Sequence, residues 1–162
     1  LLTKDGLTDK LTRVNVTNTI EALIEKRIIP VINENDSVST AEILHNGTFG
    51  DNDTLSAHVA CLINADLLII LSDIDGLYDD DPKLNDKAKR ISYVEQVTDE
   101  MEEIAKGAGS KLGTGGMHTK ISAMQMVMAK GINGVIAEGS SPQVLERILD
   151  QEDVGTFFAA TN

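Results

Sequence analysis

Asp51, Asn52 and Asp53 follow a glycine and stand directly before a stretch with the apolar spacing of a helix. An acidic residue at such a position accepts hydrogen bonds from the free N–H groups of the first turn and suits the positive end of the helix dipole. One residue is enough for that role. The cluster therefore raises the question of what its other members bind.

A glycine-rich stretch, Gly113 to Lys120 (GTGGMHTK), also leads into a helix. Glycines let the backbone approach a ligand closely, and free N–H groups at the start of the following helix favour an anion. Lys120 falls in the first turn, where a cation is unfavourable unless something negative is bound. The residue order differs from the G-x-x-x-x-G-K-[ST] phosphate loop. The pattern favours phosphate binding over the alternative, a flexible surface loop.

Ser72 and Asp73 lie where the most apolar run of the chain, residues 67–71, comes to an end. Ligands of α/β sheets usually bind beyond the carboxyl ends of the strands, so both side chains are expected in a ligand crevice. There an acid suits a hydroxyl, an amine or a metal-bound water. The aspartates at 79–81 lack the spacing of a calcium loop, and we interpret them as a solvated turn before Pro82 rather than as a calcium-binding domain.

A third polar group, Asn33 to Asp36, follows the short apolar run at 28–33. Asparagine and aspartate at the end of a strand suit the ammonium and carboxylate groups of a small polar ligand. A polar loop without a ligand would look similar, and this alternative stays open.

The composition fits one globular domain with an aliphatic core, because 41% of the 162 residues are hydrophobic, 25% are charged and only 3% are aromatic. The net charge of −12 argues against nucleic-acid binding through a broad basic surface. A bound polyanion would therefore need local lysines, backbone N–H groups or a metal ion.

Metal ligation by the protein alone is not expected. The single cysteine, Cys61, rules out an internal disulfide and a cysteine-rich zinc site. His45, His58 and His118 show no ligand spacing. No apolar run approaches the roughly 20 residues of a membrane span, and no signal peptide is visible. These features favour the cytosol.

Alternating apolar runs and helical patterns predict an α/β fold with a mainly parallel sheet. Ser141 is the expected cap of the last helix, with Pro142 at its first position. Pro30 is awkward inside a strand. We expect helices at 17–27, 54–65, 98–107, 120–131 and 140–150, strands at 28–33, 66–72, 134–139 and 155–158, a loop or small hairpin at 34–53, a polar loop at 73–90, and irregular structure at 108–120.

Together these stretches resemble the amino acid kinase family over nearly the whole chain. The residues that carry the resemblance are IPVINENDSV, FGDNDTLSA, ADLLIILSDIDGLYDDDP, GSKLGTGGMHTK, GVIAEG and VGTFF. The resemblance implies a three-layer sandwich around a mainly parallel sheet. The family's glycine- and lysine-bearing phosphate loop and its serine-containing substrate loop do not occur before Leu1. Residues 1–162 are therefore expected to be the nucleotide-binding portion of one kinase domain, incomplete at its N-terminus and without the RNA-modification-type domain of many members.

Within the family, NEND together with GDND favours the members that act on glutamate. That resemblance implies transfer of the γ-phosphoryl group of ATP to the side-chain carboxylate of glutamate, with Mg²⁺, as the first step of proline synthesis. It also implies a dimer or tetramer and commonly inhibition by proline. The alternatives are a kinase for aspartate or acetylglutamate, and a non-catalytic nucleotide-binding regulatory module.

The resemblance also assigns roles by position. It implies that Lys120 neutralises phosphate charge in the transition state and that Asp53 holds the active-site lysines and the glutamate amine. The implied glutamate-binding residues are Asp36, Asn52, Asn33 and Asp51, of which Asp51 would also help to shape the loop. The implied nucleotide-binding residues are Ser72, Asp73, Thr114, Gly115, Gly116, Met117, His118, Thr119 and Lys120.

Overall fold

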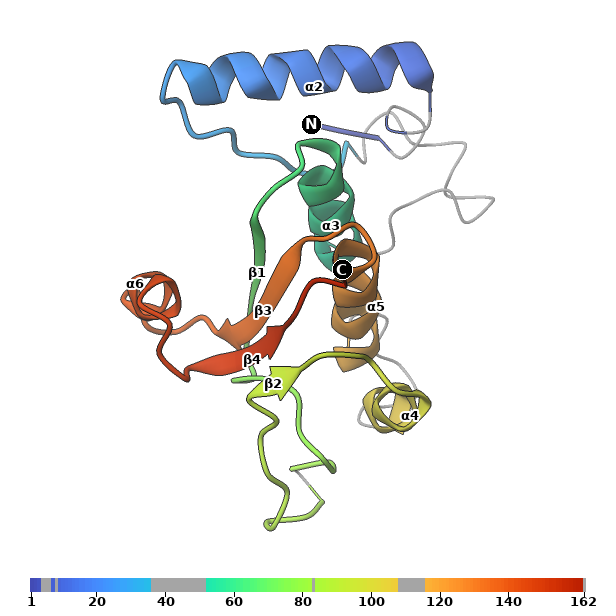
Figure 1. Cartoon of the computed structure of the whole chain (residues 1–162), viewed down its shortest axis with the longest axis vertical. Coiled ribbons are helices and arrows are strands. Elements are labelled where there is room, and N and C mark those ends of the chain that lie inside the picture. Colours follow the sequence, from blue (N-terminus) through green and yellow to red (C-terminus); the bar gives the residue numbers. More distant parts are fainter. Residues whose placement is uncertain (4–6, 8, 36–51, 83, 108–115, 162) are drawn as a thin grey trace.

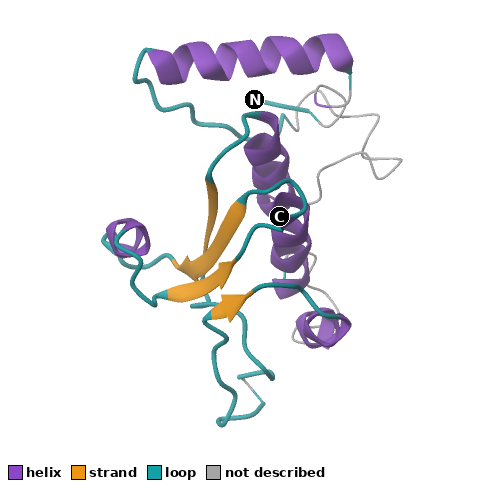
Figure 2. Cartoon of the chain, viewed as in Figure 1, coloured by secondary structure: helices purple, strands orange, loops and turns teal. Residues whose placement is uncertain are grey.

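A computed structural model describes residues 1–3, 7, 9–35, 52–82, 84–107 and 116–161. Among the described residues, helices and strands first come in pairs along the chain and alternate from α5 onward (Figures 1 and 2). The described elements are α2 (Lys10–Glu25), α3 (Asn52–Leu62), β1 (Leu67–Ser72), β2 (Tyr93–Val94), α4 (Asp99–Gly107), α5 (Met117–Met128), β3 (Asn133–Glu138), α6 (Val144–Leu149) and β4 (Gly155–Phe158).

The described strands form one sheet in the order β1-β3-β4-β2. The β1–β3 and β2–β4 pairs are parallel, whereas β3 and β4 are antiparallel. The reversal of β4 follows from the short connection before it. Helix α6 has six residues and spans roughly 9 Å, about half of the roughly 20 Å of β3, so the chain re-enters the sheet at the end where β3 leaves it. The prediction of a mainly parallel sheet is confirmed.

Helices cover both faces of the sheet, which makes three layers (Figure 1). On one face, Ile136 of β3 belongs to the main core with Ala57 of α3 and Ile121 of α5. On the other face, Val135 packs in a second core with Ile148 of α6. Successive side chains of a strand point to opposite faces, so these two neighbours on β3 serve different layers.

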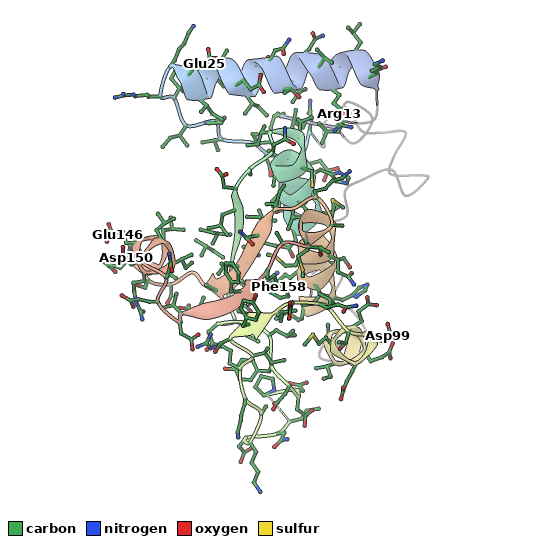
Figure 3. The ribbon with its side chains drawn as sticks, in the orientation of Figure 1. Arg13, Glu25, Asp99, Glu146, Asp150 and Phe158 are labelled. Carbon is green, nitrogen blue, oxygen red and sulfur yellow. The ribbon has the colours of Figure 1, made fainter. Side chains whose placement is uncertain are left out.

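The core is aliphatic, as its composition predicts, apart from Phe158. This is the largest fully buried side chain and lies in the middle of the molecule, whereas Glu25, Asp99 and Glu146 project from outer helix surfaces (Figure 3). None of the helices in the described residues combines the length and apolarity that a membrane span requires.

The predicted strand at 28–33 is wrong. Among the described residues, this stretch makes one sheet-like backbone hydrogen bond, in which the Leu2 N–H donates to the Asn33 carbonyl (2.9 Å). Ile29 and Val31 are 85% and 94% exposed. An apolar run becomes a strand only where another strand supplies hydrogen-bond partners, and Pro30 has no N–H to offer.

Several boundaries also differ from the sequence prediction. Helix α2 begins seven residues earlier than predicted, where the Asp9 carboxylate accepts a bond from the Thr12 N–H (2.7 Å). Its first part is not amphipathic, since Leu11 is 71% exposed, and this hides it from a periodicity search. The strand β2 was not predicted, because two residues carry no periodicity.

The predicted Ser141 cap is also wrong. Helix α6 starts at Val144, and the Ser141 hydroxyl instead lies 3.0 Å from the side-chain oxygen of Gln143. The prediction of irregular structure is wrong for residues 117–120, which form the first turn of α5. Most of the stretch predicted as a loop or hairpin, 36–51, lies outside the described residues, as do residues 108–115.

Two leucines of the loop at 73–90 test where the hydrophobic core ends. Leu77 is 1% exposed and belongs to the main core, whereas Leu84 is 84% exposed. Leu77→Ala is expected to lower the free energy of unfolding by about 2–5 kcal/mol, because it leaves a cavity. Leu84→Ala should change it by less than about 0.5 kcal/mol. Urea unfolding of both variants measures the difference, and equal losses would contradict the position of Leu77.

Candidate functional site

The starts of α3 and α5 meet through an ion pair. The Lys120 Nζ atom lies 3.0 Å from Asp53 Oδ2, and both side chains are mostly buried, with 14% and 15% exposed. The Thr119 hydroxyl lies 2.9 Å from the same carboxylate oxygen and 2.8 Å from the Gly116 carbonyl, so its one proton can go to either acceptor. These contacts join Asp53 to two residues that lie 66 and 67 positions further along the sequence.

The local structure of α5 explains why a partner is needed. The residue before the helix, Gly116, has an extended backbone (φ −103°, ψ −167°) and offers no side-chain cap, and the first turn contains no acidic residue. Free N–H groups and a lysine therefore gather at the positive end of the helix dipole. Asp53 supplies a negative charge from the first turn of α3, where an acid is itself favourable.

The pair leaves capacity for an anion. A lysine ammonium has three N–H donors, and Asp53 takes one of them. The N–H groups that begin α5 add donors of the kind that bind phosphate at helix starts. The arrangement can therefore hold an anion beside Lys120 while Asp53 fixes the direction of its side chain.

Ser72 and Asp73 lie at the carboxyl end of β1, where the two parallel strands end together. Ser72 is in register with Glu138, and its carbonyl accepts a bond from the Gly139 N–H (2.9 Å). Its hydroxyl lies 3.1 Å from Asp73 Oδ1. Ser72 follows the alternation of Leu68 and Ile70, which belong to the main core, so it is placed on the face that α3 and α5 cover.

Asn33 and Asn52 both line one groove, which has a volume of about 500 Å³ and runs along α3. Its other walls are mainly apolar side chains of α3 and the start of β1. Thus two of the four residues predicted to bind glutamate are neighbours of one cavity, although they are 19 positions apart in the sequence. The other two, Asp36 and Asp51, lie outside the described residues.

The predicted nucleotide-binding residues divide in a similar way. Gly116, Met117, His118, Thr119 and Lys120 form the start of α5. Thr114 and Gly115 lie outside the described residues. The structure gives no direct bond between the Ser72–Asp73 pair and the start of α5. The roles assigned to these residues stay predictions.

A larger cavity, of about 720 Å³, lies on the opposite face of the sheet, beside α6. Its walls include Leu67, Val135 and Phe157, and none of the predicted site residues that the structure describes contributes to it. This larger of the two cavities is therefore not where the chemistry-bearing side chains meet.

Sequence reasoning missed the contact of Thr119 with Asp53, and it missed Arg90, whose side chain joins the 73–90 loop to β4. No spacing pattern could have indicated either contact, because both depend on packing between distant segments.

Residues 1–138 match the family model described as the amino acid kinase family. The match covers most of the chain, so the chain belongs to the amino acid kinase family. It is 52% identical over 160 residues to a glutamate 5-kinase of Clostridium perfringens, covering 99% of this chain and 60% of that relative. It is 47% identical to a glutamate 5-kinase of Listeria innocua, covering 99% and 58%. The chain thus spans about 60% of the length of these two relatives.

Solved structures share the fold. A UMP kinase from Ureaplasma parvum superposes with a TM-score of 0.56 at 19% identity, covering 88% of this chain and 52% of that one. An isopentenyl phosphate kinase gives 0.58 at 20% identity, covering 87% and 50%. At such identities the likeness concerns the fold alone, and it agrees with the predicted amino acid kinase-like sandwich.

A double-mutant cycle tests the Asp53–Lys120 contact. Single and double variants, Asp53→Ala and Lys120→Met, are expected to show a coupling of about 1–2 kcal/mol in urea unfolding, because the pair is close and mostly buried. The matched control is the Arg147–Glu152 pair, which is as close (2.7 Å) but half exposed on both sides. It should show about 0–1 kcal/mol. Additive effects of Asp53 and Lys120 would contradict the contact.

Proposed function

We propose that this chain is the nucleotide-binding portion of a glutamate 5-kinase and carries part of its glutamate site. The observation that supports this most strongly is the convergence of Lys120, Thr119 and Asp53 at two helix starts. The names of the relatives at 52% and 47% identity support the substrate and the reaction.

In the proposed reaction, a side-chain carboxylate oxygen of glutamate attacks the γ-phosphorus of ATP. A new O–P bond forms, the bond to the β-phosphate oxygen breaks, and ADP leaves. Such a transfer asks little covalent chemistry of the protein, so positioning and charge stabilisation dominate. Both reactants are anions, which makes local positive charge indispensable in a chain of net charge −12.

Lys120 and the N–H groups that begin α5 bind the phosphate oxygens. The charge on the transferred group spreads over its equatorial oxygens in the transition state, where an ammonium group stabilises it. Asp53 orients Lys120 and also attracts the amine of glutamate. Ser72 and Asp73 contact the nucleotide from the end of β1.

Mg²⁺ fits this site as a companion of ATP. No group of three or more His, Cys, Asp or Glu side chains in the described part of the chain could hold a metal by itself. Mg²⁺ is commonly bound by substrate phosphates, waters and one or two carboxylates. Asp73 is an exposed carboxylate that follows the carboxyl end of β1, and it suits a metal-bound water. When bound, Mg²⁺ neutralises charge on the β- and γ-phosphates.

We propose that glutamate binds in the groove that Asn33 and Asn52 share, which supports their predicted role. Asp36 and Asp51 stay proposed partners of glutamate by position in the sequence alone. The amide side chains suit a carboxylate, and the aspartates suit the ammonium group. The wider proposal follows the resemblance to the family. It comprises the first step of proline synthesis, feedback inhibition by proline, a homodimer or tetramer, a cytoplasmic location, and no membrane or nucleic-acid partner for this portion.

The decisive variant is Lys120→Ala in the full-length protein. Glutamate-dependent ADP release is expected to fall at least tenfold, which corresponds to about 1.4 kcal/mol of barrier. The matched control is Lys130→Ala, since Lys130 is an exposed lysine just beyond the other end of α5. That variant should keep its turnover.

Unchanged turnover of the Lys120 variant would refute its role. Aspartate and N-acetylglutamate serve as competing acceptors with Mg²⁺-ATP present, and a preference for either would replace glutamate as the substrate. Binding of ATP without its consumption by any acidic amino acid would favour the regulatory module.

A further inference from the structure

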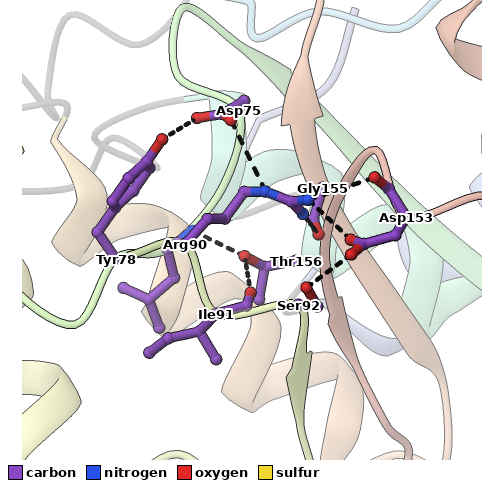
Figure 4. Close-up of polar contacts among 9 residues, drawn as sticks. Asp75, Tyr78, Arg90, Ile91, Ser92, Asp153, Gly155 and Thr156 are labelled. Carbon is purple, nitrogen blue, oxygen red and sulfur yellow. Dashed lines mark hydrogen bonds and ion pairs between the residues drawn. The ribbon is translucent and has the colours of Figure 1, made fainter. Parts of the chain in front are cut away.

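The polar loop that follows Asp73 is closed by an arginine at its far end. Tyr78 and Arg90 pair as an antiparallel bridge, and the Ile91 N–H donates to the Leu77 carbonyl (2.7 Å). The loop thus leaves β1 and returns toward β2 as a narrow excursion. The Arg90 side chain turns from this bridge toward β4 (Figure 4).

The Arg90 guanidinium joins three segments. Its Nη2 atom lies 2.8 Å from Asp153 Oδ1 and donates to the Asp153 carbonyl (3.2 Å). Its Nη1 atom donates to the Gly155 carbonyl, at the start of β4. Its Nε atom lies 3.7 Å from Asp75 Oδ2, in the loop itself. A planar group with five N–H donors can satisfy such a set of acceptors, whereas a lysine cannot.

Both carboxylates are held in turn by a hydroxyl. The Tyr78 hydroxyl donates to Asp75 Oδ1 (2.9 Å), a bond that raises the pKa of Tyr78. The Ser92 hydroxyl donates to Asp153 Oδ2 (2.8 Å), and this bond, together with Arg90, lowers the pKa of Asp153. Figure 4 shows these contacts as one continuous network around Arg90.

The backbone beside this network has little freedom. Gly76 has φ +147°, a conformation that favours glycine, and a side chain there would collide with the Thr156 hydroxyl. That hydroxyl accepts a bond from the Leu77 N–H (2.8 Å) and donates to the Ile91 carbonyl (2.6 Å). Thr156 is fully buried, so the loop base is seated on β4.

The attachment of this loop to β4 affects the proposed nucleotide site, because Asp75 is two residues beyond Asp73. We propose that Arg90 is a positioning residue: by tying Asp75 to Asp153 and Gly155, it fixes the direction in which Asp73 leaves β1 toward the nucleotide. The inference rests on the function proposed above. Removal of Arg90 would leave Asp75 and Asp153 without their shared cation, so residues 73–75 would lose this restraint while Leu77 stays in the core.

The expected effect is on nucleotide geometry more than on folding. Asp75 and Asp153 are 47% and 61% exposed, and ion pairs of such exposure add little to stability. The loop keeps its buried anchor at Leu77 when Arg90 is replaced.

The test compares Arg90→Gln, Arg90→Lys and Arg147→Gln in the full-length protein. Arg147 pairs with Glu152, next to Asp153, but touches neither the loop nor β4 through that pair, so it is a matched control. For Arg90→Gln we expect the KM for ATP to rise at least tenfold while the KM for glutamate stays within twofold. Arg90→Lys should lie between this variant and the wild type, and Arg147→Gln should match the wild type.

A fall in melting temperature with an unchanged KM for ATP would make Arg90 merely structural and overturn the inference. Equal rises in both KM values would overturn it as well. If the wild type binds ATP but does not phosphorylate glutamate, the proposed function fails alone. Arg90 is then judged by the Kd for ATP from calorimetry, with the same tenfold rise expected. A wild type that binds no ATP would end both proposals.

Discussion

The contact between the Lys120 ammonium and the Asp53 carboxylate is the constraint on which the candidate site depends. It is made at the starts of two neighbouring helices, α3 and α5, which both pack in the main core, where Ala57 and Ala123 are almost fully buried. Each helix start alone would carry a partial positive charge, but it would not orient the Lys120 ammonium group. Together they place one oriented ammonium group beside free N–H groups, at the side of the sheet where β1 delivers Ser72.

This arrangement reconciles the charge of the protein with an anionic ligand. The chain carries a net charge of −12, so no broad attraction draws a polyphosphate to its surface. The positive potential has to be local, and it has to be shielded from the surrounding carboxylates. Asp53 leaves donor capacity for an anion, because it engages one of the three N–H donors of Lys120 and also bonds to Thr119.

The parts of the fold that sequence reasoning predicted are those with a local cause. The apolar runs of β1, β3 and β4 and the helical spacing of α3 and α5 are visible within ten or so residues. The run at 28–33 shows the limit of this reasoning, since apolar character made it a predicted strand but no strand among the described residues completes it. The site divides in the same way. Glycine, lysine and acid patterns indicated Lys120 and Asp53 separately, whereas their pairing and the Arg90 network arise from segments more than 60 positions apart.

The most direct test is a crystal structure of the full-length protein with Mg²⁺ and a non-hydrolysable ATP analogue. We expect phosphate oxygens about 2.7–2.9 Å from Lys120 Nζ and from the nitrogen atoms of the N–H groups that begin α5, with the Asp53 contact preserved. A triphosphate bound on the opposite face of the sheet, beside α6, or a Lys120 side chain turned away from the phosphates, would contradict it.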